Sequence, residues 1–164
     1  MVRTSLEDGR AFFRHGHRIA VVGVSRDPKD FSRFVLRELV RRGHDAVPVN
    51  PALGEADGVR AFARVQELDP PPDAALLLVP PSRAEAAVRD CLVARVKRIW
   101  FHRGAGAGAA SEAALALCQA NRVEVIQGLC PLMALPAAGL PHRLHAFFRG
   151  ALGHPVHAHP PHAH

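Results

Sequence analysis

The sequence has few cysteines and no long apolar run. Cys91, Cys118 and Cys130 are odd in number and lack Cys-x-x-Cys spacing, which argues against a disulfide framework or a cysteine-based zinc site. No apolar stretch approaches the roughly 20 residues that a membrane span requires, so we expect no membrane association. Residues 1–18 contain early acidic side chains and no continuous apolar segment of the secretory type. We therefore expect a cytoplasmic protein.

Tyrosine is absent and lysine is scarce. Only Lys29 and Lys97 accompany the arginines among the 21 basic residues, and the formal net charge is +6. A basic chain can bind nucleic acid or a phosphorylated small molecule. Here the arginines are spread along the predicted helices, often beside Asp or Glu, and no dense basic block with interleaved aromatic residues occurs. We therefore expect no nucleic-acid partner.

Strand-like segments alternate with helix-like segments along most of the chain. Apolar, β-branched runs predict five strands, at residues 18–22, 45–49, 74–79, 97–101 and 123–126. Apolar residues at helical spacing predict helices between them, over 31–42, 82–92 and 111–120. Strands that alternate with helices imply a parallel sheet. The predicted class is α/β: a Rossmann-like doubly wound sheet of about five parallel strands with helices on both faces.

We assign residues 1–150 to this domain and treat 151–164 as a separate tail. The tail contains five histidines, three prolines and no other ionisable side chain, so it has little to bury and is predicted to be disordered. Its histidines are irregularly spaced and no carboxylate or thiol accompanies them. This pattern predicts adventitious metal binding and no dedicated metal site.

Several polar residues have the spacing of helix caps. Thr4 with Glu7, and Ser82 with Glu85, match the capping box, in which a hydroxyl and a carboxylate satisfy free backbone N–H groups. Ser32 is placed to cap the helix that follows the first strand. These positions predict where three helices begin.

The turn after the first predicted strand carries the most chemistry. Gly23 has no Cβ, so a ligand can approach the backbone there. Ser25 can donate its hydroxyl, while Arg26, Lys29 and Arg33 can reach phosphate oxygens. Free N–H groups at the start of the next helix also favour an anion. From the residues alone, the turn fits a phosphate site and an ordinary solvated loop equally well.

The same turn differs from a site of the NAD type. Such sites have G-x-G-x-x-G here and an acidic residue at the end of the second strand, whereas this turn has one glycine and the second strand ends at Asn50-Pro51. Residues 104–109 formally match G-x-G-x-x-A, but the strand after them ends at Gln127-Gly128. We interpret 104–109 as a loop. An NAD(P)-linked redox sensor that uses it remains an alternative.

Several segments together resemble a known family. They are IAVVGVS (19–25), the helix that begins near Ser32, VPVNP (47–51), LLLVPPS (76–82), KRIWFHRGA (97–105) and the pair Cys130-Pro131. Each segment is moderately specific, and their joint order carries the likeness. The chain resembles the small stand-alone CoA-binding domain proteins, which are related to the N-terminal CoA-binding domain of succinyl-CoA synthetase α subunits. The resemblance covers about residues 5–135.

The resemblance implies a set of ligand contacts at the strand ends. The residues that would meet the phosphates of CoA are Gly23, Val24, Ser25, Arg26, Lys29, Ser32 and Arg33. Those at neighbouring strand ends are Asn50 and Pro51 beside the nucleotide, and Val79, Pro80 and Ser82 along the adenine or pantetheine arm. His102 occupies a position where the family often has glutamine or another polar group. The exit at 130–133 lacks the acidic residue common in close relatives.

Catalytic groups are hard to find in the sequence. Cys130 follows the last strand, and a cysteine nucleophile there would need His102 as its base. We interpret Cys130 instead as an inert small hydrophobe. No Ser-His-Asp, paired-carboxylate, HExxH or P-loop pattern occurs. We therefore predict a module that binds or senses CoA or an acyl-CoA without evident catalysis, with no protein partner indicated. The alternative is an enzyme or enzyme subunit that acts on a CoA thioester.

Overall fold

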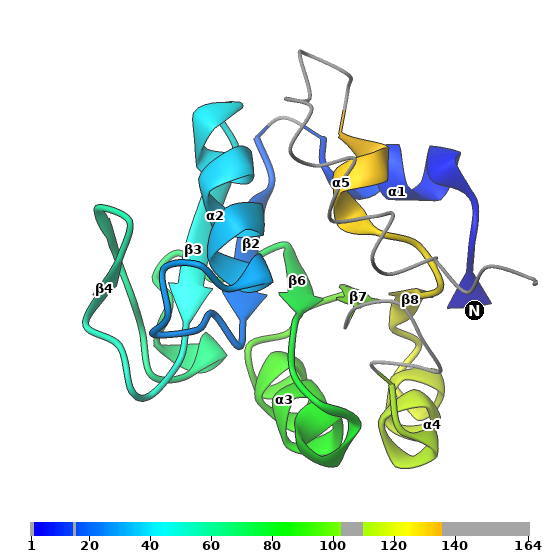
Figure 1. The fold of residues 1–164 in the computed structure, drawn as a ribbon. Helices are drawn as coiled ribbons and strands as arrows, with labels where there is room; N and C mark the ends of the chain where they lie inside the picture. Colours follow the sequence, from blue (N-terminus) through cyan, green and yellow to red (C-terminus); the bar gives the residue numbers. More distant parts are fainter. Residues whose placement is uncertain (1, 15, 103–109, 136–164) are drawn as a thin grey trace, which may run out of the picture.

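A parallel six-stranded sheet forms the centre of the molecule (Figure 1). The computed structural model describes residues 2–14, 16–102 and 110–135. The sheet has the order β1-β8-β7-β6-β2-β3, and every neighbouring pair is parallel. Its strands are β1 (Val2–Arg3), β2 (Arg18–Val22), β3 (Asp45–Val49), β6 (Ala74–Leu77), β7 (Arg98–Phe101) and β8 (Glu124–Ile126). The α/β class is confirmed. The unpredicted strand β1 has two residues, too few to show periodicity.

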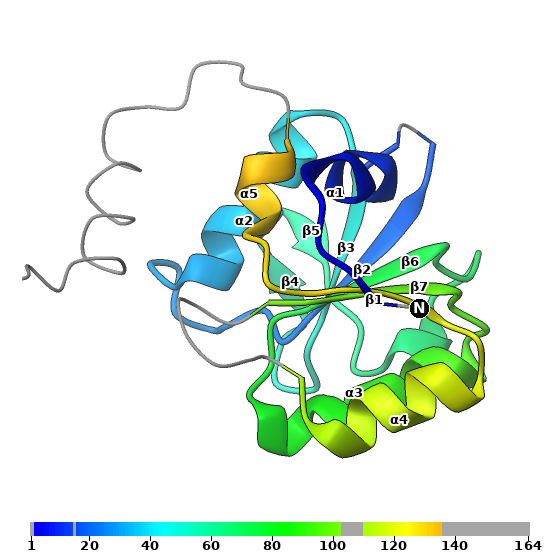
Figure 2. The ribbon, with the colours of Figure 1, turned by 90° about the vertical axis from the view of Figure 1, so that its right-hand side faces the viewer.

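Helices cover both faces of this sheet. They are α1 (Leu6–Phe12), α2 (Phe31–Arg41), α3 (Pro81–Val93), α4 (Glu112–Ala120) and α5 (Pro131–Ala134), with the short 3₁₀ helix η1 (Val65–Glu67). Helices α1, α2 and α5 lie on one face, and α3 and α4 lie on the other (Figures 1 and 2). This two-sided cover is the Rossmann-like arrangement that the sequence predicted.

The alternation of side chains along each strand divides the core in two. In β2, Ile19 and Val21 pack toward α1, α2 and α5, whereas Ala20 and Val22 pack toward α3 and α4. All four are buried, as expected for a strand covered on both faces. Trp100 of β7 lies in the half of the core that faces α1, α2 and α5, and its Nε1 donates to the Leu129 carbonyl at 3.1 Å.

Three predicted helix starts are wrong by one or two residues. Helix α1 is capped by Ser5, whose Oγ accepts from the Asp8 N–H, and not by Thr4. Helix α2 is capped by Asp30 in place of Ser32. Helix α3 begins earlier than the Ser82–Glu85 box requires, because Pro81 takes its first position and makes no demand for an N–H acceptor.

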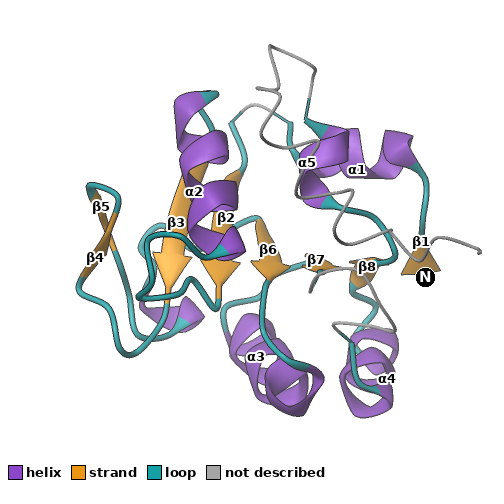
Figure 3. Cartoon of the chain, in the orientation of Figure 1, coloured by secondary structure: helices purple, strands orange, loops and turns teal. Residues whose placement is uncertain are grey.

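A small hairpin that the sequence did not predict lies beside α2 and β3 (Figure 3). It consists of β4 (Glu55–Ala56) paired antiparallel with β5 (Val59–Arg60). Its turn, Asp57-Gly58, has positive φ at both residues, 52° and 80°, which is the conformation that Asp-Gly turns favour. The chain then returns along β3, where Phe62 bridges to Val49.

Three predictions concern residues outside the described part of the chain. They are the Gly/Ala stretch 104–109, the domain boundary at 150 and the histidine-rich tail. Across the described ranges, the helices fall short of the length and apolar character that a membrane crossing requires.

The strand order reverses between β2 and β6. From β2 the chain moves to β3 on one side, then crosses to β6 on the other, and in such sheets ligands bind outside the carboxyl ends at the reversal. Gly23 follows β2 at this point with φ +90°. A Cβ on Gly23 would lie 2.8 Å from the Leu78 carbonyl oxygen and 2.7 Å from Val79 Cγ1. The chain's own close approach therefore requires glycine here.

Replacing Gly23 by alanine should destabilise the fold. The new methyl group would lie 2.8 Å from the Leu78 carbonyl oxygen, and the alanine would have to adopt a positive φ. We therefore expect a loss of about 2 kcal/mol or more in the free energy of unfolding. Urea denaturation measures it. Gly54→Ala is the matched control, because a Cβ added at Gly54 would meet no atom within 4 Å and its φ is not positive. Equal urea midpoints for Gly23→Ala and Gly54→Ala would contradict the close packing of the chain against Gly23.

Candidate functional site

The loop between β2 and α2, residues 24–30, is closed by its own side chains. Ser25 Oγ accepts from the Asp27 N–H at 3.1 Å, and Asp27 Oδ1 accepts from the Lys29 N–H at 2.9 Å. The Ser25 N–H donates to Ser32 Oγ at 2.8 Å. These bonds from short polar side chains to nearby backbone are typical of tight turns. The loop therefore has a defined shape without a ligand.

The start of α2 is already satisfied by a carboxylate. Asp30 Oδ1 accepts from the Ser32 N–H at 2.8 Å and also from the Ser32 hydroxyl. The sequence predicted free N–H groups here that would attract an anion, but the Asp30 side chain occupies that role. Ser32 instead connects the cap to the loop and is buried. An anion at this point would meet a negative neighbour.

Arg33 has a partner that the sequence pattern does not reveal. Its Nε donates to Asp57 Oδ2 at 2.7 Å, and its Nη1 donates to the Ser25 carbonyl at 3.3 Å. Arg33 is 9% exposed, and its guanidinium lowers the pKa of the Asp57 carboxyl below the ordinary value. The one local signal for Asp57 was the Asp-Gly turn. Arg33 therefore supports the loop, with two of its donors engaged by the protein.

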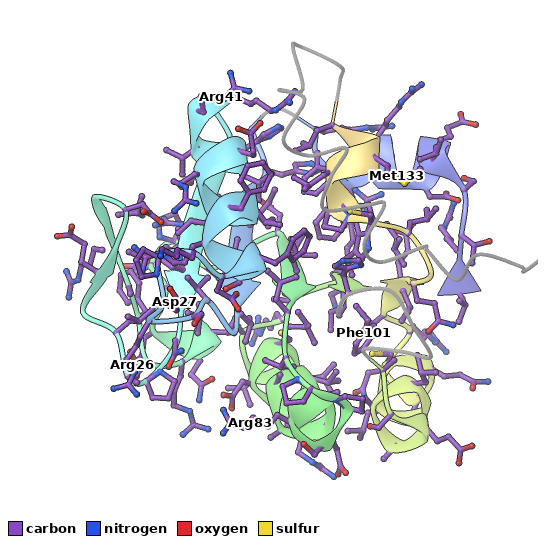
Figure 4. The ribbon with its side chains drawn as sticks, in the orientation of Figure 1. Arg26, Asp27, Arg41, Arg83, Phe101 and Met133 are labelled. Atoms are coloured by element: carbon purple, nitrogen blue, oxygen red, sulfur yellow. The ribbon has the colours of Figure 1, made fainter. Side chains whose placement is uncertain are left out.

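Arg26 and Lys29 present the available positive charge of the loop. Both residues are exposed, and neither makes an ion pair within the described part of the chain. Figure 4 labels Arg26 and Asp27 on this loop and Arg83 at the start of α3. The side chain of Val24, in contrast, is fully buried in the core. The whole residue is 0% exposed and its carbonyl accepts from Asn50 Nδ2, so the Val24 backbone is as covered as its side chain.

The neighbouring strand ends approach this loop directly. Asn50, after β3, donates from Nδ2 to the Val24 carbonyl at 2.7 Å, while its Oδ1 accepts from the Ala52 N–H at 2.8 Å. Val79, after β6, lies against Gly23. The Asn50 amide therefore holds the loop, and its predicted place beside a nucleotide stays a prediction. The other predicted residues here are Pro51, which is exposed, Pro80, which precedes α3 at its N-cap position without a side-chain bond, and Ser82, which is exposed in the first turn of α3.

His102 and Cys130 complete the same edge of the sheet. The His102 ring lies 5.3 Å from the Phe31 ring of α2, measured between centroids. Burial lowers the pKa of His102 and raises the pKa of the Cys130 thiol. No hydrogen bond between the two is present among the described residues. At neutral pH the arrangement favours a neutral imidazole and a protonated thiol, and not an activated nucleophile.

We expect slow alkylation of Cys130 in the native protein. Burial raises its pKa, so iodoacetamide at pH 7.5 should react at least about tenfold more slowly than with free cysteine, with peptide mass spectrometry reporting each site. Cys91 and Cys118 are buried, and burial raises the pKa of Cys118 to about 11, so they should react more slowly still. A Cys130 rate above that of free cysteine, reduced by His102→Ala, would contradict this account.

The fold and the edge define a class of protein. The sheet is doubly wound, a preformed loop follows its first central strand, and exposed cations lie beside the reversal of strand order. This is the arrangement of a Rossmann-like α/β domain, in which ligands bind at the reversal of strand order.

Comparison with known proteins gives the family. The model of a family described as a CoA binding domain matches residues 17–136, most of the chain. The chain belongs to this CoA-binding domain family. This agrees with the resemblance found in the sequence segments.

Three relatives illustrate the likeness. Uncharacterized protein YneT of Bacillus subtilis is 36% identical over 73 residues, 44% of this chain and 54% of that protein. The subunit alpha of ADP-forming acetate–CoA ligase II of Pyrococcus furiosus is 32% identical over 81 residues, 49% of this chain and 18% of that protein. A conserved hypothetical protein of Pyrococcus furiosus has a solved structure with a TM-score of 0.64 at 30% identity, covering 71% of this chain and 97% of that one. The matches span about half or less of the two curated relatives.

Proposed function

We propose that this chain binds CoA or an acyl-CoA at the β2–α2 loop and the adjoining strand ends, as a binding or sensing module. The observation that carries the proposal is the pairing of a preformed loop with the exposed cations Arg26 and Lys29 at the reversal of strand order. A loop that is already ordered loses little entropy when a ligand binds. The proposed location is the cytoplasm, as expected from the sequence.

The charges near the loop favour a phosphate-rich ligand over NAD. CoA carries several phosphate groups, which suit cations such as Arg26 and Lys29. An NAD site would use a carboxylate at the end of the second strand to bind ribose hydroxyls. Here that position is Asn50, whose amide is engaged with Val24 and Ala52. The membership in the CoA-binding domain family supports the same ligand.

A role as part of a CoA-thioester enzyme is the second candidate. It is favoured by one observation: a curated relative is a subunit of an acetate–CoA ligase, and the match spans 18% of that subunit. The chemistry would then require groups from outside this domain, because His102 and Cys130 are both shifted toward their neutral forms. Release of free thiol from acetyl-CoA by the isolated chain would support a catalytic role over a binding one.

Removing the two loop cations should weaken CoA binding. We expect the double variant Arg26→Ala, Lys29→Ala to lose about tenfold or more in affinity, because charge-assisted bonds to phosphate disappear. Titration calorimetry with CoA, acetyl-CoA, NAD and ATP measures the affinities. CoA should bind more tightly than NAD.

The matched control removes one arginine and one lysine at the opposite edge of the sheet. Arg14 and Lys97 are exposed and line a hollow of about 590 Å³ beside the amino-terminal ends of β2, β6 and β7. The variant Arg14→Ala, Lys97→Ala should bind CoA as the unchanged protein does. Equal weakening in both double variants would mean that CoA responds only to the net charge of +6. No CoA binding at millimolar ligand would refute the proposal.

A further inference from the structure

One carboxylate at the tip of the β4–β5 hairpin contacts two arginines of α2. Asp57 Oδ2 accepts from Arg33 Nε at 2.7 Å, and Asp57 Oδ1 lies 3.4 Å from Arg37 Nη1. Arg33 and Arg37 are four residues apart on α2, so their side chains are neighbours on one face of the helix and repel each other. The carboxylate lies between these two positive charges and neutralises part of their repulsion.

Each arginine makes a second bond, to the backbone of the β2–α2 loop. Arg33 Nη1 donates to the Ser25 carbonyl at 3.3 Å, and Arg37 Nη1 donates to the Pro28 carbonyl at 3.0 Å. Ser25 lies near the beginning of the loop and Pro28 near its end. A single residue of the hairpin is therefore linked, through two guanidinium groups, to two separate points of the loop.

The hairpin itself is held in place independently of these arginines. The Ala61 N–H donates to the Gly54 carbonyl at 2.9 Å, which closes the base of the hairpin. Phe62 then exchanges backbone bonds with β3, because its N–H donates to Pro48 and its carbonyl accepts from Asn50. The tip can thus act as a fixed support. Figures 1 and 3 show the hairpin beside the β2–α2 loop.

The ion pair that joins the hairpin to α2 is partly shielded from water. The side chain of Arg33 is 11% exposed and that of Asp57 is 21% exposed, so solvent screens this contact less than an ordinary surface pair. Asp57 also holds a positive φ of 52°, which aspartate tolerates better than most residues. The contact is thus built from a residue suited to the turn and a buried arginine.

We propose that Asp57 is a positioning residue for ligand binding: through Arg33 and Arg37 it holds the β2–α2 loop in the conformation that receives the phosphates. This inference rests on the proposed function for the identity of the ligand. It assigns Arg33 to the support of the loop, and leaves direct phosphate contact to Arg26 and Lys29. A loop that samples other conformations would bind more weakly, in proportion to the fraction of time spent in the competent one.

The test is the variant Asp57→Asn, which keeps the size and the turn preference but removes the charge. Hydrogen exchange of the loop amides, measured without ligand, should become about tenfold faster, and CoA affinity should fall about tenfold. Glu55→Gln is the matched control. It removes a carboxylate from the same hairpin, and Glu55 forms no ion pair within the described residues. Its loop exchange should equal that of the unchanged protein.

A double-mutant cycle separates positioning from a general loss of stability. In a background of Arg33→Gln with Arg37→Gln, the change Asp57→Asn should no longer alter loop exchange, because the route to the loop is already broken. Loop exchange in Asp57→Asn equal to that in Glu55→Gln would overturn the inference. Faster exchange with unchanged or tighter CoA binding would overturn its ligand-binding part. If the unchanged protein binds no CoA, the proposed function fails, and the exchange measurement still decides the role of Asp57.

Discussion

The close packing of Gly23 against Leu78 and Val79 is the constraint on which the rest of the site depends. It joins the ends of β2 and β6 at the point where the strand order reverses, and only a residue without a side chain fits at this distance and φ. From there α2 leaves toward one face of the sheet and α3 toward the other. The loop between β2 and α2 is therefore anchored by the residue directly before it, and polar side chains fix the remainder.

The cations around this loop fall into two groups with different roles. Arg33 and Arg37 are engaged with Asp57 and with loop carbonyls, so they contribute to the shape of the loop. Arg26 and Lys29 are exposed and unpaired within the described residues, so their charge is available to a ligand. Asn50 adds a third support through the Val24 carbonyl. A structure that orders its own loop in this way can discriminate between ligands by shape as well as by charge.

Much of the fold could be predicted from the sequence because strands leave strong local signals. The limits of β2 and β3 are those that the apolar runs predicted, at 18–22 and 45–49. The caps were harder, because Thr4, Ser5, Asp30 and Ser32 are all capable of the role and only the chain path selects among them. The hairpin was missed because its strands have two residues each.

The sequence places the candidate site residues along the chain but does not show their contacts within the protein. The sequence placed Arg33 at the site but had no means of finding Asp57, which is 24 residues away and reaches α2 only through tertiary structure. In the same way, the glycine at 23 was read as an opening for a ligand, whereas its missing Cβ makes room for Val79. Packing decides whether a group such as Arg33 or Gly23 contacts the protein itself or is open to a ligand, and a residue pattern does not contain this information.

The central claim is that a phosphate-bearing ligand occupies the carboxyl edge of the sheet at the β2–β6 reversal. The most direct measurement is a titration of isotopically labelled protein with CoA, followed by the amide chemical shifts. The account predicts the largest shifts in the backbone of residues 23–33 and 78–82, and small shifts in residues 94–98 at the opposite edge. Large shifts confined to 94–98, or none at millimolar CoA, would contradict it.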